Sequence, residues 1–183
     1  TCRLKELDLL KDNHPWRFHV PEQTYVSFKT FSDKVEKINV SQAMSDFVIK
    51  RRDGLPAYQL TSVVDDIELG VNLVVRGNDL RNSTSAQLLL AQCLNNKVFP
   101  EVIFVHHELL KDNSGKKLSK SAGAFSLKKL REKHHSAVWI YQETAKSLKL
   151  PFQNICSLED LKEVFRSAVK KKEGLAIMLD QGK

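Results

Sequence analysis

The sequence predicts an α/β fold, because strand and helix patterns alternate along its middle. Residues 71–77 (VNLVVRG) are an apolar run rich in β-branched side chains and bounded by glycines, which is typical of a buried parallel strand. Residues 83–96 (STSAQLLLAQCLNN) follow with a helix pattern, capped by Asn82 or Ser83, and residues 99–107 (FPEVIFVHH) form a second apolar strand. This order predicts a βαβ unit, the building block of a doubly wound sheet.

The residues before this unit are predicted to be mostly β-structure. Residues 15–28 (PWRFHVPEQTYVSF) alternate apolar and polar side chains between prolines. Residues 45–56 (SDFVIKRRDGLP) contain a short strand and then an Asp53-Gly54 turn. In residues 57–69 (AYQLTSVVDDIEL) the apolar side chains recur at helical spacing, which favours a helix.

The residues after the unit are predicted to be helical. Residues 127–150 (LKKLREKHHSAVWIYQETAKSLKL) form one helical stretch, which Pro151 interrupts. A further amphipathic helix begins at Ser157, and Asp160 three residues later completes the pattern of a capping box. The length of 183 residues suits one domain, or a domain with a small appendage.

Positive charge is concentrated in one segment. The net charge is +7, and the segment from Lys111 to Lys133 carries eight basic and two acidic residues, a net +6. Such a patch indicates a polyanionic partner, either nucleic acid or polyphosphate, although a solvated basic helix start explains charge alone equally well. No apolar run approaches the ~18 residues that a membrane helix needs, so no membrane partner is expected.

Cysteines and histidines give no sign of a metal centre in this chain. The cysteines, Cys2, Cys93 and Cys156, are odd in number and far apart, which argues against a disulfide framework and fits a reducing cytoplasm. The histidine pairs 106–107 and 134–135 are adjacent residues, and neighbours on a strand point to opposite faces. We therefore expect surface or core histidines and no metal site.

Two polar stretches follow the two predicted strands. Arg76 to Asp79 comes directly after the first, and the sequence GKKLSKS (residues 115–121) comes a few residues after the second. Ligands of open α/β sheets bind at the carboxyl ends of the strands. Lysines on a glycine-flanked loop can close on a polyphosphate, and Ser119 can donate a hydrogen bond to the same oxygens. The G-x-x-x-x-G-K-[ST] pattern of a P-loop is absent.

These stretches resemble class I aminoacyl-tRNA synthetases. KLSKS at residues 117–121 is similar to their KMSKS signature. Residues 46–84 are similar to the catalytic core of glutamyl- and glutaminyl-tRNA synthetases, with RxDGxPxYxL, VVDD, a strand ending in RG-x-[DE] and an S/N-T helix cap in that order. The resemblance covers roughly residues 1–130. It implies the second half of a class I Rossmann-like nucleotide-binding fold.

The resemblance also implies a division of the chain. Residues 1–50 would be the end of a β-rich acceptor-binding insertion. Residues 51–125 would be the C-terminal half of the nucleotide-binding catalytic fold, including the KLSKS loop. Residues 126–183 would be a helical appendage.

Site residues follow from the resemblance position by position. Tyr58 and Arg76 match residues that bind the substrate glutamate, and the planar fork of an arginine suits a carboxylate. Asp79 matches an acidic residue near the ATP ribose. The remaining matches are Leu109 and Leu110 at the adenine, and Lys117, Ser119 and Lys120 as catalytic loop residues at the ATP phosphates, with Mg²⁺ carried by the ATP.

Several departures from the family pattern are visible. No HIGH-like histidine motif occurs, Ala57 stands where threonine is common, and Ala86 stands where arginine is common. The expectation is therefore a C-terminal portion of a longer synthetase, inactive by itself. The TCR sequence around Cys2 resembles the tail of a zinc-binding stretch of the insertion, so zinc is possible in the longer protein only.

The implied function is activation of glutamate with ATP and its transfer to tRNA, in the cytoplasm, by a monomer. Glutamine as the substrate stays open, because glutaminyl enzymes share most of the pattern. Two alternatives also remain. One is a short relative without an anticodon-binding region, such as a glutamyl-queuosine tRNA-Asp synthetase, since only residues 122–183 follow the lysine loop. The other is a non-catalytic RNA-binding paralogue.

Overall fold

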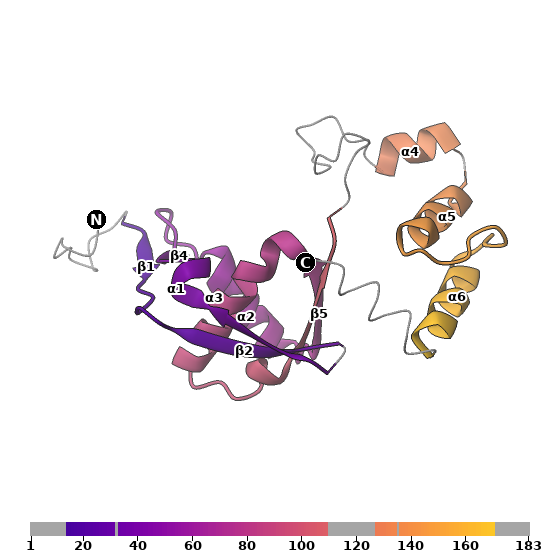
Figure 1. The fold of residues 1–183 in the computed structure, drawn as a ribbon. Helices are drawn as coiled ribbons and strands as arrows, with labels where there is room; N and C mark the ends of the chain where they lie inside the picture. Colours follow the sequence, from indigo (N-terminus) through magenta and orange to yellow (C-terminus); the bar gives the residue numbers. More distant parts are fainter. Residues whose placement is uncertain (1–13, 32, 110–126, 135, 171–183) are drawn as a thin grey trace. The chain divides into compact units, whose positions relative to one another are not determined.

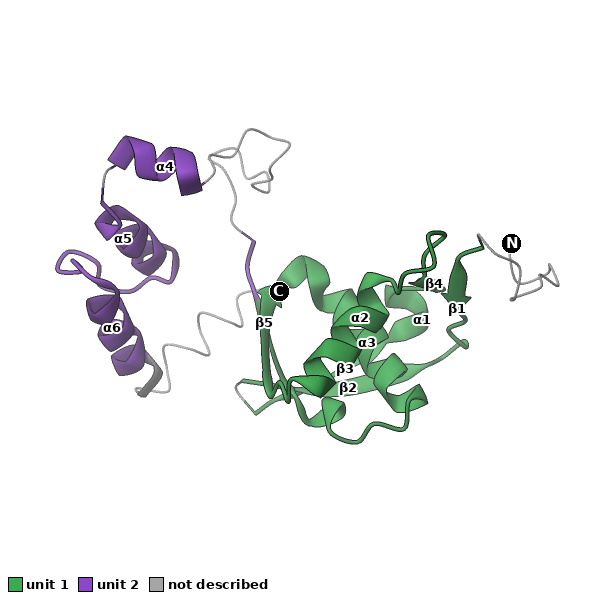
Figure 2. Ribbon diagram, turned by 180° about the vertical axis from the view of Figure 1, so that it is seen from behind, with its two compact units in different colours: residues 1–106 green, residues 107–183 purple. Residues whose placement is uncertain are grey.

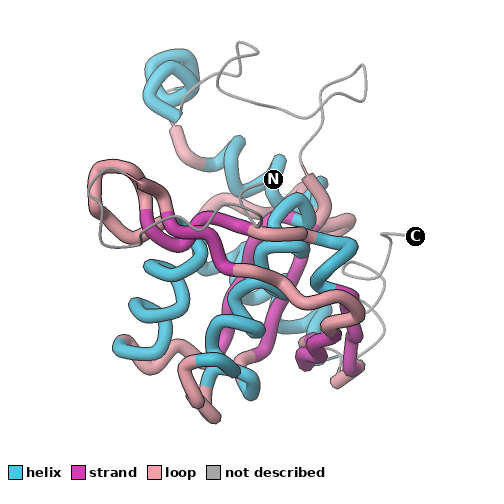
Figure 3. Tube along the Cα trace, turned by 90° about the vertical axis from the view of Figure 1, so that its left-hand side faces the viewer, coloured by secondary structure: helices cyan, strands magenta, loops and turns pink. Residues whose placement is uncertain are grey.

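The computed structural model describes residues 14–31, 33–109, 127–134 and 136–170. The chain divides into two compact units, Thr1–His106 and His107–Lys183 (Figure 2). Both helices and strands are present, as the secondary-structure colouring of Figure 3 shows, so the predicted α/β class is confirmed. In the described ranges no helix is long and apolar enough to span a membrane.

The first unit contains most of the sheet structure (Figure 1). Its strands and helices in chain order are β1 (Trp16–Phe18), β2 (Tyr25–Thr30), β3 (Val35–Asn39), α1 (Val40–Ala43), β4 (Phe47–Lys50), α2 (Tyr58–Glu68), β5 (Leu73–Gly77), α3 (Arg81–Cys93) and β6 (Ile103–His107), with short 3₁₀ turns at Asn78–Leu80 and Phe99–Glu101. The predicted helix in residues 57–69 and the turn at Gly54, whose φ is +83°, are both confirmed.

The main sheet has the strand order β3-β2-β6-β5. Strands β2 and β3 form an antiparallel hairpin, and β2 runs parallel to β6. The backbone N–H of Ile103 donates to the carbonyl of Asn72 at 3.0 Å, so β5 and β6 begin side by side. The predicted β5–α3–β6 unit is therefore present, and the first residues of its two strands lie next to each other. Strands β1 and β4 pair separately as an antiparallel ribbon.

Helix α3 is the centre of the first unit's core. Every residue from Ser83 to Ala91 is buried, as expected for a helix that is covered on all sides. Phe104 contacts Phe28 and Phe99 edge-on, with ring centroids 5.6 and 5.9 Å apart, beneath this helix. The small side chains and leucines of α3 thus fix its position against β2 and β6, and with it the polar side chains it carries.

Two expectations for this unit are wrong. Neither Asn82 nor Ser83 caps α3: the 3₁₀ turn leads directly into the helix, whose N-cap is Leu80. The Asn82 amide instead donates to the carbonyl of Ala43, and the Ser83 hydroxyl accepts from Gln59. Strand β5 is also not buried on both faces, because it is the last strand in the described sheet.

In the part of the second unit that the structure describes there are three helices, α4 (Leu127–His134), α5 (Val138–Ser147) and α6 (Leu158–Lys170). The predicted stretch 127–150 is thus two helices. A small core of Ala145, Leu150 and Ile155 lies between α5 and α6. The predicted capping box is confirmed: the Asp160 N–H donates to Ser157 Oγ at 3.2 Å, and the Ser157 N–H donates to Asp160 Oδ2 at 2.8 Å.

The predicted domain boundaries at residues 50 and 125 stay predictions. Strands β2 and β3, which lie within residues 1–50, share a sheet with β6.

Candidate functional site

The side chain of Arg76 is the centre of the candidate site. Arg76 is the penultimate residue of β5, where the strand ends and the 3₁₀ turn begins. Its Nη1 donates to Gln87 Oε1 at 2.8 Å, and its Nη2 donates to Thr84 Oγ1. The guanidinium lies over the ring of Phe104, 5.2 Å from the centroid. Helix α3 and strand β6 together therefore hold this arginine in one orientation.

Burial makes the charge on Arg76 costly. Desolvation lowers the pKa of Arg76 below its usual value, while Tyr58 and Asp66 act in the opposite direction. The Nε atom is buried and has no hydrogen-bond partner among the described residues. Each Nη atom carries a second N–H beyond its bond to Gln87 or Thr84, and a half-buried guanidinium of this kind is suited to an anion.

Tyr58 and Arg76 are brought together, as the sequence interpretation expected. Tyr58 is the first residue of α2 and is 52% exposed, and its hydroxyl interacts with the guanidinium. Its exposure leaves one side of the phenol open to a ligand. The role of the two residues in holding glutamate stays a prediction at this point.

Asp66 adds a carboxylate to the same site from the third turn of α2. Partial burial raises the pKa of Asp66, Arg76 lowers it, and the neighbouring Asp65 raises it again. The net result is a carboxyl that ionises less readily than usual, beside an arginine that is costly to bury.

The residues predicted for ATP are placed only in part. Asp79 lies exposed in the 3₁₀ turn after β5. Leu109 is half-buried and belongs to the second unit. Four further candidates, Leu110, Lys117, Ser119 and Lys120, lie outside the described residues, as does Cys2.

Sequence interpretation missed the side chains that hold Arg76. Thr84 Oγ1 lies 2.7 Å from His106 Nε2, and the His106 ring stacks on Phe104 with 6.4 Å between centroids. Thr84 and Gln87 are three residues apart on α3, so both face the same way. Their polarity alone does not single them out, because α3 carries other buried polar side chains, Ser83 and Ser85. His106 had been expected as an ordinary surface or core residue, whereas it contacts the site through Thr84.

Within residues 14–31, 33–109, 127–134 and 136–170, no three His, Cys, Asp or Glu side chains group as a metal site would need. The second histidine pair contributes packing, because the His134 ring lies 4.4 Å from that of Trp139. That the chain has no metal site stays a prediction.

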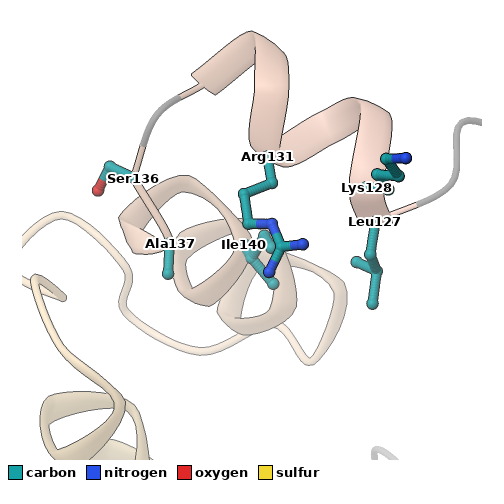
Figure 4. A pocket seen from close by; sticks show the side chains of 6 residues that line it. All are labelled: Leu127, Lys128, Arg131, Ser136, Ala137 and Ile140. Carbon is teal, nitrogen blue, oxygen red and sulfur yellow. The ribbon is translucent and has the colours of Figure 1, made fainter.

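A separate pocket of about 370 Å³ lies between α4 and α5 (Figure 4). Its lining is largely apolar, with two cations from α4; the residues are Leu127, Lys128, Arg131, Ser136, Ala137 and Ile140. None of them is among the predicted glutamate or ATP residues.

Comparison with known proteins defines the class of this protein. The family model of class I tRNA synthetases (E and Q), catalytic domain, matches residues 5–173. The chain therefore belongs to this family of ligases, and the resemblance to the glutamyl and glutaminyl enzymes is confirmed.

Individual relatives are glutamyl-Q tRNA(Asp) synthetases and a glutamate–tRNA ligase. The chain is 39% identical over 121 residues to a glutamyl-Q tRNA(Asp) synthetase of Burkholderia cenocepacia, covering 65% of this chain and 40% of that protein. It is 39% identical over 123 residues to a glutamyl-Q tRNA(Asp) synthetase of Methylococcus capsulatus, covering 67% and 39%. It is 40% identical over 126 residues to glutamate–tRNA ligase 2 of Mesorhizobium japonicum, covering 64% and 27%. The chain thus spans at most 40% of the length of these relatives.

Among solved structures, the chain is similar to a glutamate-tRNA synthetase from Elizabethkingia anophelis. The sequences are 27% identical, the TM-score is 0.49, and the match covers 58% of this chain and 21% of that one.

Proposed function

We propose that this chain is part of a class I synthetase that activates glutamate with ATP and transfers the glutamyl group to tRNA. The observation that carries the proposal is Arg76, a half-buried guanidinium held at the end of β5 by one bond from each of its two Nη atoms. Its positive charge in a half-buried site favours a substrate with a carboxylate side chain over the neutral amide of glutamine. Membership of the E and Q family fits either amino acid, so the charge of Arg76 alone carries the preference for glutamate.

In the proposed reaction, Arg76 and Tyr58 hold glutamate by charge and by a hydroxyl hydrogen bond. The α-carboxylate of glutamate attacks the α-phosphorus of ATP, a bond to phosphorus forms, and the bond to pyrophosphate breaks. The products are glutamyl-adenylate and pyrophosphate, and a hydroxyl group of the RNA then displaces AMP. Holding the reactants in this geometry supplies most of what a synthetase must do.

The ATP side of the site is assigned by the family pattern. Asp79 contacts the ribose, and Leu109 and Leu110 hold the adenine. Lys117, Ser119 and Lys120 stabilise the charge that develops on the departing pyrophosphate, together with the Mg²⁺ that accompanies ATP. Zinc would belong only to a longer protein in which Cys2 has further cysteine partners.

We propose that the chain is one part of a larger enzyme. It lacks a HIGH-like motif, so by itself it would be inactive. The complete enzyme would be a cytoplasmic monomer whose partners are tRNA, glutamate and ATP.

A second candidate is a glutamyl-queuosine tRNA-Asp synthetase, which would transfer glutamate to a modified base. Relatives carrying that kind of name match at 39% identity over 121 and 123 residues. A non-catalytic RNA-binding paralogue is the third candidate, and the Arg76 site opposes it, because RNA binding has no use for a grip on a carboxylate.

ATP–pyrophosphate exchange by the complete gene product, with and without tRNA, separates the three. Exchange with glutamate alone supports the tRNA-modifying enzyme. Exchange that requires tRNA supports the ordinary ligase. No glutamate-dependent exchange under either condition would rule out the enzyme proposal.

A further inference from the structure

The hydroxyl of Thr84 stands between two groups of the candidate site. It receives a hydrogen bond from Nη2 of Arg76, and it lies 2.7 Å from Nε2 of His106. Thr84 is fully buried, so water does not compete for these contacts. The histidine is thereby linked to the arginine through one oxygen atom.

Donor and acceptor chemistry fixes the direction of the bond between Arg76 and Thr84, and the distances favour a direction for the bond to His106. A guanidinium can only donate, so the Thr84 oxygen must accept from Arg76. The single hydroxyl proton can then go to His106 Nε2 at 2.7 Å or to the Leu80 carbonyl at 3.5 Å. The first distance is that of a good hydrogen bond and the second lies at the limit. The shorter contact favours donation to His106 Nε2, and this arrangement places the proton of a neutral ring on Nδ1.

Gln87 completes the support. Its side-chain oxygen accepts from Nη1 of Arg76 at 2.8 Å, and the residue is only 1% exposed. Thr84 and Gln87 lie one turn apart on a buried helix, so the two acceptors cannot move independently. The Phe104 ring lies against one face of the guanidinium and fixes the orientation of its plane. The two hydrogen bonds fix how the guanidinium is turned within that plane.

We propose that Thr84, Gln87 and His106 are positioning residues that orient the Arg76 guanidinium for the substrate carboxylate. His106 acts through Thr84, because by taking the hydroxyl proton it commits the Thr84 oxygen to the arginine. The inference rests on the proposed function, since it assigns these side chains to glutamate binding. A guanidinium that loses one anchor rotates more freely and grips a carboxylate less well.

The test compares three variants of the chain by NMR of the arginine side chains. Thr84→Val keeps the shape and removes the hydroxyl, and Thr84→Ser restores the hydroxyl. Ser85→Ala is the matched control, because Ser85 is also buried on α3 but its hydroxyl donates to the Asn82 carbonyl. The readouts are the rotation rate of the Arg76 guanidinium about its Nε–Cζ bond and the response of its Nε signal to added glutamate.

We expect Thr84→Val to speed the rotation and to weaken glutamate binding by about tenfold or more, the size of one charged hydrogen bond. Thr84→Ser and Ser85→Ala should match the original chain in both readouts. Unchanged rotation in Thr84→Val, or equal effects in Ser85→Ala, would overturn the positioning role.

The His106 tautomer provides a test in the unaltered chain, which does not depend on any variant folding. Imidazole ¹⁵N shifts should show a neutral ring with the proton on Nδ1, and a proton on Nε2 would overturn the part assigned to His106. If the original chain shows fast, unrestrained rotation, positioning fails. If rotation is restrained but glutamate causes no response, the proposed function fails for this chain while the orientation of Arg76 stands.

Discussion

At the scale of single residues, the site combines Arg76, Tyr58 and Asp66. The pKa values of Arg76 and Asp66 are both shifted by burial and by their charged or polar neighbours. Arg76 pays a desolvation cost that Tyr58 and Asp66 partly offset. Asp66 in turn is harder to ionise than an ordinary aspartate, because burial and Asp65 outweigh the attraction of Arg76. Such opposed effects are typical of sites that bind a charged ligand. The side chains there are placed to suit the ligand, and without it they lower the stability of the folded chain.

Asp66→Asn is predicted to stabilise the first unit at pH 7. The folded-state pKa of Asp66 is raised, so the folded chain holds the proton more tightly and the ionised carboxylate opposes folding above that pKa. The gain should be below about 1 kcal/mol, because the side chain is only partly buried. It should shrink as the pH falls through the folded pKa and vanish below the unfolded value of 3.8.

Urea unfolding of both forms between pH 3 and pH 8 checks this sign. The control is Asp53→Asn, whose carboxylate forms an exposed ion pair with Arg51. An Asp66→Asn variant that is less stable at pH 7 than at pH 4, relative to the original chain, would contradict the assignment.

At the scale of elements, the sequence predicted the order of strands and helices better than their ends. The periodicity of residues 57–69 identified α2, and the β5–α3–β6 unit follows from two apolar runs separated by one helix. The α3 cap was misplaced because the local pattern of Asn82 and Ser83 cannot show their tertiary partners, Ala43 and Gln59.

The same limit applies to the site. Arg76 could be predicted because an arginine that ends an apolar strand needs an anion. Thr84 and His106 could not, because their contact joins α3 to β6 and depends on how the two pack.

Helix α2 offers a prediction at this scale. Its N-cap is Ala57, with extended backbone angles and no side-chain hydrogen bond to the first turn. A serine hydroxyl at this position would accept from a backbone N–H of the first turn, so Ala57→Ser should raise the free energy of unfolding by about 1 kcal/mol. Chemical denaturation measures the change, with Ala57→Gly as the variant expected to give a smaller gain or none. Equal or lower stability in Ala57→Ser would contradict the cap assignment.

At the scale of the whole molecule, the described residues form two hydrophobic cores without a common residue. One includes Phe28, Phe99 and Phe104 in the first unit, and the other centres on Ala145, Leu150 and Ile155 in the second. Each core can therefore be weakened separately.

Ile155→Ala is predicted to destabilise the second unit by about 2–5 kcal/mol, because Ile155 is 1% exposed and its loss leaves a cavity. Hydrogen exchange should show faster amide exchange in α5 and α6, while the amides of α3 and β6 keep their protection. Val64→Ala, at a side chain 37% exposed on α2, is the control for a surface apolar truncation. Equal loss of protection in α3 would show that the two cores unfold as one.

The proposed selection of glutamate by Arg76 is tested most directly by ATP–pyrophosphate exchange of the complete gene product with glutamate and with glutamine, in the presence of tRNA. The original protein should exchange with glutamate and far less with glutamine. Arg76→Gln removes the charge, so it should lower kcat/KM for glutamate by about tenfold to a hundredfold, in line with one or two charged hydrogen bonds. Undiminished exchange with glutamate in Arg76→Gln would contradict the account, because the carboxylate would then be held elsewhere.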